Sequence, residues 1–304
     1  MFVLLSLVVA QSSGPRVELS LIVTDKDNKS INTIRKEEVH VFEDNVEQPV
    51  VSLEADARPV DCVLAIDASG SFRLFLVATL AAARMIIDNR RPADEIAIER
   101  FISSDKIEKF HDFTTDGNAL IDSFKSFKVE GGQSAVVDAL YVAVQAVSDH
   151  NKSADRRKVV VLFSDGEDRN SFYKSETLLK LLRERQVQIF VVGITMDLDK
   201  DSGLVRRSPR ETAEKLINSV AGETGGRAFF PKDGKELTEA AAEIVHDLRA
   251  QFRVVYTSNS TKTGARKIEV KLSDGNGEKR TAVTRRRYNA QSNLPAQANE
   301  KKSP

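Results

Sequence analysis

At both ends of the chain, hydrophobic residues alternate with polar ones, a pattern that predicts β-strands with one buried face. The segments that show it are VELSLIVTD, EEVHVFEDN and EQPVVSLEA in the N-terminal flank, and FRVVYTSN, ARKIEVKLS and KRTAVTRR in the C-terminal flank. Either flank alone has no second layer against which to bury its apolar face. We therefore predict that residues 15–58 and 252–288 pack together as one small all-β sandwich that is split in sequence.

The pattern changes between these flanks, where residues 59–251 alternate apolar strand candidates with amphipathic helical stretches. Strand candidates such as KVVVLF are apolar almost throughout, which indicates burial on both faces and hence a parallel sheet covered by helices. This order predicts an α/β domain with a doubly wound, mainly parallel sheet, inserted in the sandwich. Ligands bind such sheets beyond the carboxyl ends of the strands.

The two ends of the chain differ in composition from the predicted domains. Residues 1–14 contain the apolar run FVLLSLVVA, which has the length of a signal-peptide core but no basic residue before it. We expect an exported protein, in the periplasm, the outer envelope or the medium, with a first β-strand as the alternative reading of this run. Residues 289–304 are polar and contain proline, which predicts a disordered tail.

Composition excludes several classes of protein. The 304 residues carry 45 Lys and Arg against 45 Asp and Glu, so the chain has no net charge with which to hold a nucleic acid. Beyond the N-terminal run, which is too short to cross a bilayer, no segment is long and apolar enough for a transmembrane helix. The single cysteine, Cys62, excludes an internal disulfide and lies in an apolar strand candidate.

Oxygen-bearing side chains follow the first strand of the predicted α/β domain. Asp67, Ser69 and Ser71 come directly after the apolar stretch VDCVLAI, at alternate positions. An irregular turn between a strand and a helix can direct such side chains toward one point. One carboxylate and two hydroxyls form a hard ligand set of low charge that suits Mg²⁺, with Mn²⁺ or Ca²⁺ as alternatives.

Two further loops of the same domain supply similar groups. Asp165 follows the buried strand candidate KVVVLFS, and Ser134 precedes the helical stretch AVVDALYVAVQAV. In a doubly wound sheet these loops meet at the edge where Asp67 lies. The sequence therefore predicts one metal site formed by Asp67, Ser69, Ser71, Ser134 and Asp165.

The segments DASGS, GGQSAVVDAL and LFSDGED resemble the three loops of the metal-ion-dependent adhesion site in the von Willebrand factor type A (VWA) family. The flanks, with VTDKD and RKIEVK, resemble those of a bacterial VWA-related family. The resemblance implies a Rossmann-like fold in which Ser69 and Ser71 bind the metal directly, and Asp67 and Asp165 bind it directly or through water. Ser134 stands where the family has threonine, so the hydroxyl is kept but the methyl that stiffens χ1 is lost.

This resemblance implies a non-enzymatic, Mg²⁺-dependent protein-binding or adhesion module, in which an Asp or Glu of a partner protein completes the metal shell. Phe72 and Gln133 stand beside the loops and are candidates for partner contacts, with helix-start and loop-filler roles as alternatives. Two other functions stay open: a structural envelope protein with a vestigial site, and a Mg²⁺-dependent hydrolase. Against the hydrolase, none of the four histidines lies beside the D-x-S-x-S loop in sequence.

Two remaining segments have simpler interpretations. Residues 196–203 place aspartates at alternate positions, as an EF-hand loop does, but the glycine comes one residue late. We therefore expect a solvated loop there. The last helical stretch, GKELTEAAAEIVHDLRAQF, leads directly into a strand and predicts a rigid connection, with an axial shift of the helix as the alternative.

Overall fold

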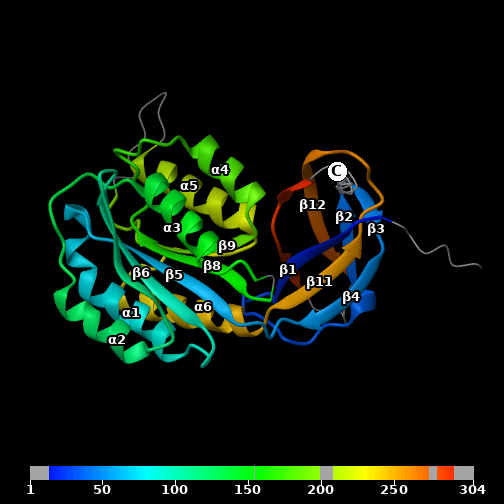
Figure 1. The fold of residues 1–304 in the computed structure, drawn as a ribbon, viewed down its shortest axis with the longest axis horizontal. Helices are drawn as coiled ribbons and strands as arrows, with labels where there is room; N and C mark the ends of the chain where they lie inside the picture. The colour runs from blue at the N-terminus through cyan, green and yellow to red at the C-terminus, as the bar shows by residue number, and fades with distance from the viewer. Residues whose placement is uncertain (1–13, 154, 199–207, 274–278, 291–304) are drawn as a thin grey trace, which may run out of the picture.

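The computed structural model describes residues 14–153, 155–198, 208–273 and 279–290. Two units lie side by side, a larger one of helices around a sheet and a smaller one built mainly of strands (Figure 1). The expected signal segment, but for Gly14, lies outside the described residues, as does most of the expected tail. None of the helices within the described ranges is long and apolar enough to cross a membrane.

The larger unit is built on one six-stranded sheet with the order β10-β9-β8-β5-β6-β7. All neighbours in it pair in parallel except β6 and β7. Its strands are β5 (Val60–Asp67), β6 (Glu95–Ser103), β7 (Lys106–Thr114), β8 (Arg157–Ser164), β9 (Val187–Gly193) and β10 (Ala228–Phe229). From β5 the chain first builds the sheet on one side and then continues with β8 on the other. The strand order thus reverses between β5 and β8, which is where such sheets bind ligands.

Helices cover both faces of this sheet (Figure 1). On one face, α1 (Leu76–Asp88), α2 (Gly117–Ser123) and α6 (Gly234–Arg249) pack on one hydrophobic cluster. On the other, α3 (Val136–His150), α4 (Ser175–Glu184) and α5 (Pro209–Thr224) pack on a second cluster. Short 3₁₀ turns also occur, η2 (Gly70–Leu74) after β5 and η3 (Phe124–Ser126) after α2. The prediction of a doubly wound, mainly parallel sheet is confirmed.

The smaller unit contains two antiparallel sheets, with the orders β13-β1-β11-β4 and β14-β12-β2-β3. Each sheet takes strands from both flanks of the chain, and residues of both sheets share one core cluster. The strands are β1 (Arg16–Thr24), β2 (Val39–Glu43), β3 (Val46–Gln48), β4 (Val50–Ala55), β11 (Phe252–Thr257), β12 (Gly264–Leu272), β13 (Thr281–Val283) and β14 (Arg287–Ala290), and a 3₁₀ turn, η1 (Lys36–Glu38), precedes β2. The split sandwich predicted from the flanks is therefore the observed fold.

Two details of the sandwich differ from the sequence expectation. The segment EQPVVSLEA forms two strands because Pro49, which has no N–H to donate, separates β3 from β4. Strand β14 reaches Ala290, two residues into the stretch expected to be a disordered tail, because it pairs with β12 through the Gly264–Ala290 register.

Polar contacts join the two units where α6 leads into β11. The buried carboxylate of Asp247, on α6, accepts hydrogen bonds from Ser30 and from Arg227, the latter over 2.7 Å. Arg227 also donates to the carbonyl of Asn28, in the same turn of the sandwich as Ser30. The end of α6 is thus fixed to the sandwich by side chains as well as by the chain itself.

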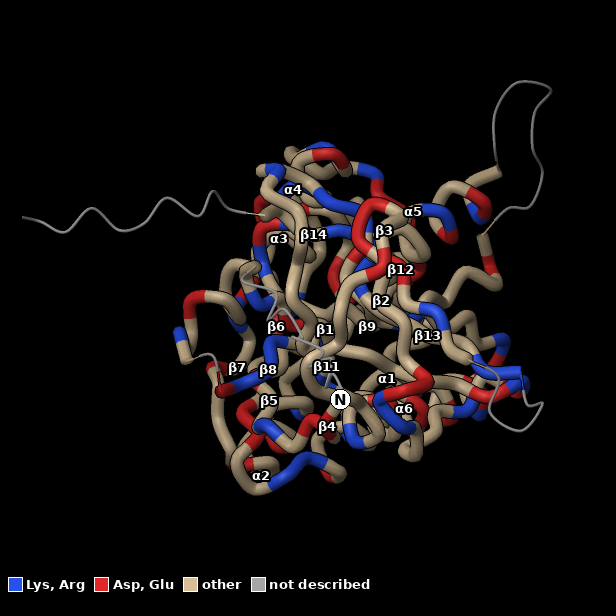
Figure 2. The backbone as a smooth tube through the Cα atoms, turned by 90° about the vertical axis from the view of Figure 1, so that its right-hand side faces the viewer, with Lys and Arg blue, Asp and Glu red and all other residues tan. Residues whose placement is uncertain are grey.

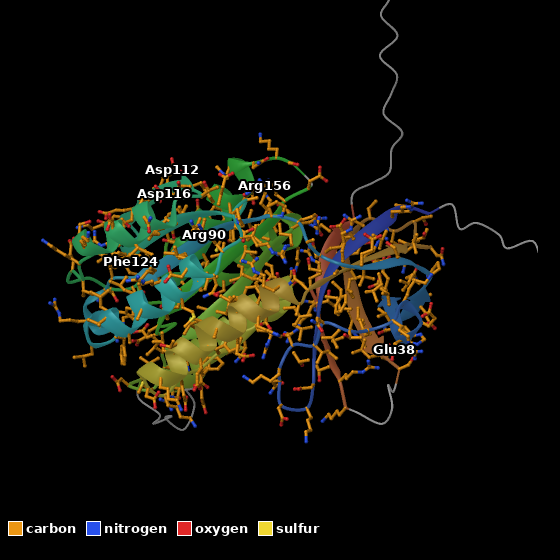
Figure 3. All side chains as sticks on the ribbon, turned by 90° about the horizontal axis from the view of Figure 1, so that it is seen from below. Glu38, Arg90, Asp112, Asp116, Phe124 and Arg156 are labelled. Carbon is orange, nitrogen blue, oxygen red and sulfur yellow. The ribbon has the colours of Figure 1, made fainter. Side chains whose placement is uncertain are left out.

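A cleft of about 710 Å³ also lies between the units, lined in part by the first residues of β8 and β9. It is therefore at the amino edge of the sheet, away from the loops that follow β5 and β8. Basic and acidic side chains share its lining, and Arg156, on the α/β side of it, is labelled in Figure 3. On the face of the protein seen in Figure 2, Lys and Arg are likewise interspersed with Asp and Glu.

Candidate metal centre

Asp67 is the last residue of β5, a strand that is buried along its whole length. Its carboxylate is fully buried and accepts three hydrogen bonds. Oδ1 accepts from the N–H of Ser69 over 2.9 Å, and Oδ2 accepts from the hydroxyls of Ser134 and Ser164 over 3.0 and 2.8 Å. Asp67 therefore joins the loop that follows β5 to the end of β8 and to the loop before α3.

Ser69 and Ser71 stand at the start of the η2 turn, where the hydroxyl oxygens lie 3.3 Å apart. Ser69 is buried whereas Ser71 is exposed. The Ser71 hydroxyl donates to Oδ2 of Asp165 over 2.9 Å. The group of oxygens thus extends from the buried carboxylate of Asp67 to the protein surface.

Asp165 follows β8 directly and is held by a tight turn. Its Oδ1 accepts from the N–H of Glu167 over 2.9 Å, and the Ser164 hydroxyl accepts from the N–H of Gly166 over 3.0 Å. Gly166 has a φ of 75°, in the left-handed region that favours glycine. A Cβ there would lie 2.5 Å from Cδ1 of Ile217 on α5. Glycine is therefore needed for both the conformation and the packing of this turn.

The loop before α3 connects with both of the others. The buried Ser134 donates its hydroxyl to Asp67, and its carbonyl accepts from the N–H of Arg169 over 2.9 Å. In the same loop, the N–H of Glu130 donates to the carbonyl of Ala68 over 2.9 Å. The structure therefore brings all five residues predicted from the sequence into one connected group.

Electrostatics at this point favour a cation. Burial raises the pKa of Asp67 to about 6, and the nearby negative charge of Asp165 adds to the shift. Burial also raises the pKa of Asp165. Arg169 lies in the loop that begins with Asp165, and its guanidinium forms a salt bridge with Glu167. Two buried carboxylates beside hydroxyl oxygens are a donor set that fits a hard divalent cation, because such an ion offsets their repulsion.

Some features of this region were not anticipated. Ser164 was not selected from the sequence, yet its hydroxyl donates to Asp67 and accepts from the N–H of Gly166 in the Asp165 turn. Its position at the end of the strand, in the segment FSDGED, is the signal that could have identified it. The partner-contact expectation for Phe72 is wrong, because the ring is fully buried in the core beneath the loops. Gln133 is exposed at the surface, as a contact residue must be.

The other candidate groups lie elsewhere. Asp61, Glu95 and His150 form a second cluster, but Arg156 and Lys158 form ion pairs with its carboxylates. Asp61 stands near the start of β5, whereas Asp67 ends that strand. Cys62 is buried, and its burial raises the pKa of the thiol. Of the aspartates in the EF-hand-like stretch, Asp199 and Asp201 lie outside the described residues.

The histidines contact groups remote from the three loops. His40 contacts Glu47 and Ser273 in the sandwich. His111 contacts the carbonyl of Asp112, and His150 contacts Glu95. The fourth, His246, lies in the last turn of α6.

Fold and loops together define a doubly wound α/β protein with an oxygen-ligand group at the carboxyl edge of its sheet. The family model for the von Willebrand factor type A domain matches residues 61–243, so this chain belongs to the VWA family. No curated protein sequence matches it.

Three solved structures with this fold are distant from this chain in sequence. A von Willebrand factor type A protein from Catenulispora acidiphila superposes with a TM-score of 0.53 at 14% identity, over 90% of this chain and 75% of that one. Proximal thread matrix protein 1 from the mussel byssus gives 0.51 at 17% identity, over 68% and 51%. A structure of the byssus protein with a zinc-occupied metal-ion-dependent adhesion site gives 0.51 at 18% identity, over 66% and 48%. At these identities the likeness establishes the fold alone.

Proposed function

We propose that this protein is a Mg²⁺-dependent protein-binding module, in which a carboxylate of the partner completes the coordination of the metal. One observation carries the proposal: Asp67, Ser69, Ser71, Ser134 and Asp165 are joined by hydrogen bonds at the carboxyl edge of the sheet. The membership of the VWA family supports it, since the matched range, residues 61–243, contains all five residues, and their segments resemble the family's adhesion-site loops.

Each residue has a role in this proposal. Ser69 and Ser71 bind the metal through their hydroxyls, and Ser134 supplies a third hydroxyl. Asp67 and Asp165 provide the negative charge, directly or through water, while hydrogen bonds from Ser164 and from the backbone hold them in place. The bound metal supplies an open coordination position with residual positive charge, which a partner carboxylate can occupy.

The oxygen-only donor set supports Mg²⁺, and Mn²⁺ or Ca²⁺ fit the same chemistry. Zinc occupies the adhesion site of the byssus protein, and this finding describes that protein alone. We do not propose hydrolysis, because no histidine contact within the described residues reaches these loops. A structural role with a vestigial site differs from our proposal in one measurable respect, the absence of metal binding.

Calorimetric titration with Mg²⁺ tests the proposal. We expect binding heat for the wild-type protein and none for Asp67→Ala or Asp165→Asn. Asp122→Asn is the matched control and should leave the heat unchanged, because this exposed carboxylate pairs with Lys125 on α2 and η3, away from the loops. Circular dichroism must show that each variant is folded. Absence of metal-linked heat in the folded wild-type protein would contradict the proposal and favour the structural role.

We also propose that the protein is exported, on the strength of the N-terminal apolar run. N-terminal sequencing of the protein recovered from whole-cell fractions tests this. Export predicts a mature protein in the envelope or medium that begins near Gln11, whereas a cytosolic protein that retains Met1 would refute it.

A further inference from the structure

Large apolar side chains are strongly exposed beside the candidate metal centre. Leu74, Val77 and Phe172 are 84%, 82% and 81% exposed, whereas Val46 in the sandwich, the next in rank among the large apolar residues that the structure describes, is 60% exposed. Leu74 ends the turn that begins with Ser69 and Ser71, Val77 follows in the first turn of α1, and Phe172 lies in the loop that begins with Asp165. Single exposed apolar residues are ordinary, but their concentration around one functional edge is typical of an interaction surface.

Phe172 is exposed but firmly held. Its N–H donates to Oδ2 of Asp138 over 2.7 Å, and the N–H of Tyr173 donates to Oδ1 over 2.8 Å. The Phe172 ring meets the Tyr173 ring edge-on at 5.3 Å, and Tyr173 stacks on Tyr141 of α3 at 4.0 Å. The backbone that carries the ring is therefore fixed, and the ring has an aromatic neighbour on one side, which limits the entropy that a partner must remove on binding.

Asp138 connects the loop that carries Phe172 and Tyr173 to the helix that follows Ser134. It lies in the first turn of α3, one helical turn after Ser134, and it is buried. Its carboxylate accepts from two backbone N–H groups of the Phe172 loop and from Ser104. Because the carbonyl of Ser134 also accepts a hydrogen bond from the N–H of Arg169 in this loop, the Phe172 loop and the metal-site loops are connected by hydrogen bonds.

The exposure of Leu74 follows from the η2 turn. Phe72 turns inward and is fully buried, so Leu74 and its neighbour Arg73 point to the surface. Arg169 is also exposed on the opposite loop, and its guanidinium pairs with Glu167. The exposed charge of Arg73 favours an acidic partner over a basic one, whereas the charge of Arg169 is offset by Glu167.

We propose that Phe172 is the apolar anchor of the partner-binding surface, and that the partner segment carries an apolar residue close to the acidic residue that binds the metal. Leu74 and Val77 extend the apolar contact on the other side. This inference rests on the proposed metal-dependent binding and specifies the partner as an acidic and apolar peptide segment. An exposed aromatic ring on a fixed backbone can contribute a large part of the binding energy of a protein interface.

A phage-displayed library of random dodecapeptides, selected on the full chain in Mg²⁺ and eluted with EDTA, tests the inference. Parallel selections use Phe172→Ser and, as the matched control, Val46→Ser, which removes an exposed apolar side chain far from the loops. We expect the wild-type protein and the Val46 variant to enrich peptides with Asp or Glu beside an apolar residue. The Phe172 variant should keep the preference for the acid and lose the preference for the apolar neighbour.

The outcomes separate the inference from the proposed function. An acidic consensus with no apolar preference, or the same consensus for wild type and Phe172→Ser, would overturn the anchor role and leave metal-dependent binding intact. Failure of EDTA to elute any enriched peptide from the folded wild-type protein would overturn both.

Fluorescence anisotropy with one enriched peptide gives the size of the effect. We expect Phe172→Ser to weaken binding by about tenfold or more, and Phe172→Leu to retain most of the affinity. Replacing the peptide's acidic residue by its amide should abolish binding to every variant. Equal affinities of the wild-type and Phe172→Ser proteins would contradict the inference. Matching thermal unfolding midpoints confirm that each variant is folded.

Discussion

At the scale of single residues, the central sheet contains an ionisable side chain that is not part of the candidate metal site. Glu99 lies in the middle of β6, beside Ala65 of β5, and is buried. Its Oε1 has no hydrogen-bond partner within the described part of the chain. Burial raises the pKa of this carboxyl well above its ordinary value of 4.5. The folded protein therefore holds a proton on Glu99 that the unfolded chain loses as the pH rises.

We predict that Glu99→Gln stabilises the protein above pH 4.5. Between pH 4.5 and the higher pKa of the folded state, the folded protein binds more protons than the unfolded chain, so its free energy of unfolding falls as pH rises. The amide removes this dependence. Urea denaturation at pH 5 and pH 8 should show a larger gain at pH 8. The exposed Glu239→Gln serves as control, and an equal gain at both pH values would contradict the prediction.

Ser134 offers a second test at this scale. Its hydroxyl donates to Asp67, and the resemblance of its loop to those of the VWA family implies a threonine position. We predict that Ser134→Ala lowers the affinity for Mg²⁺ by about tenfold or more, because loss of a ligand or its support typically has this effect. Ser134→Thr keeps the hydroxyl and should retain binding. Calorimetry on both variants checks this, and unchanged affinity in Ser134→Ala would remove Ser134 from the site.

At the scale of the element, the turns after β5 and β8 decide where the oxygen ligands lie. The first turn buries Phe72 and exposes Ser71, and the second needs a left-handed residue directly after Asp165. The surrounding glycines are not equivalent. Gly166 is enclosed by α5, whereas a Cβ added to Gly131 would meet no atom within 4 Å.

We predict that Gly166→Ala destabilises the protein by about 1–3 kcal/mol, because alanine is strained at this φ and its Cβ would press on Ile217. It should also weaken Mg²⁺ binding by displacing Asp165. Gly131→Ala, in the neighbouring loop, is the control and should leave stability nearly unchanged. Urea denaturation measures the first effect and calorimetry the second; equal stability of the two variants would disprove the packing argument.

At the scale of the whole molecule, the sandwich depends on both flanks of the chain. Strand β11 lies between β1 and β4, so that Arg16 pairs with Thr257 and Ala55 with Phe252. The N-terminal strands of this sheet have no direct ladder with each other. The α/β unit, by contrast, contains its whole sheet between Val60 and Phe229.

We predict that a chain ending at residue 251 loses the sandwich and keeps the α/β fold. Without β11, strands β1 and β4 have no partner, and their apolar faces lose the opposing layer. Amide hydrogen exchange should then show protection along β5 and β8 but not along β1. Protection of β1 in the shortened chain would mean that the N-terminal flank folds alone. The full-length protein provides the reference.

The sequence was sufficient for the class of each unit, and it selected five residues that the structure brings together at the edge of the sheet. The continuous apolar runs of β5 and β8 indicated a buried parallel sheet, and the strand ends in Asp67 and Asp165 marked its carboxyl edge. The orientation of individual loop side chains could not be predicted from the sequence. Nothing in the local pattern distinguished Phe72, which is buried, from Leu74, which is exposed.

By itself, the sequence determined most of the secondary structure, the two fold classes and the chemistry available at the sheet edge, because periodicity and side-chain type are properties of short segments. Only the tertiary structure decided that Ser164 joins Asp67, that β1 pairs with β11, and that Phe172 stands exposed on an aromatic support. Each of these depends on segments that are distant along the chain. Their meeting is decided by the packing of helices and sheets, which no local pattern encodes.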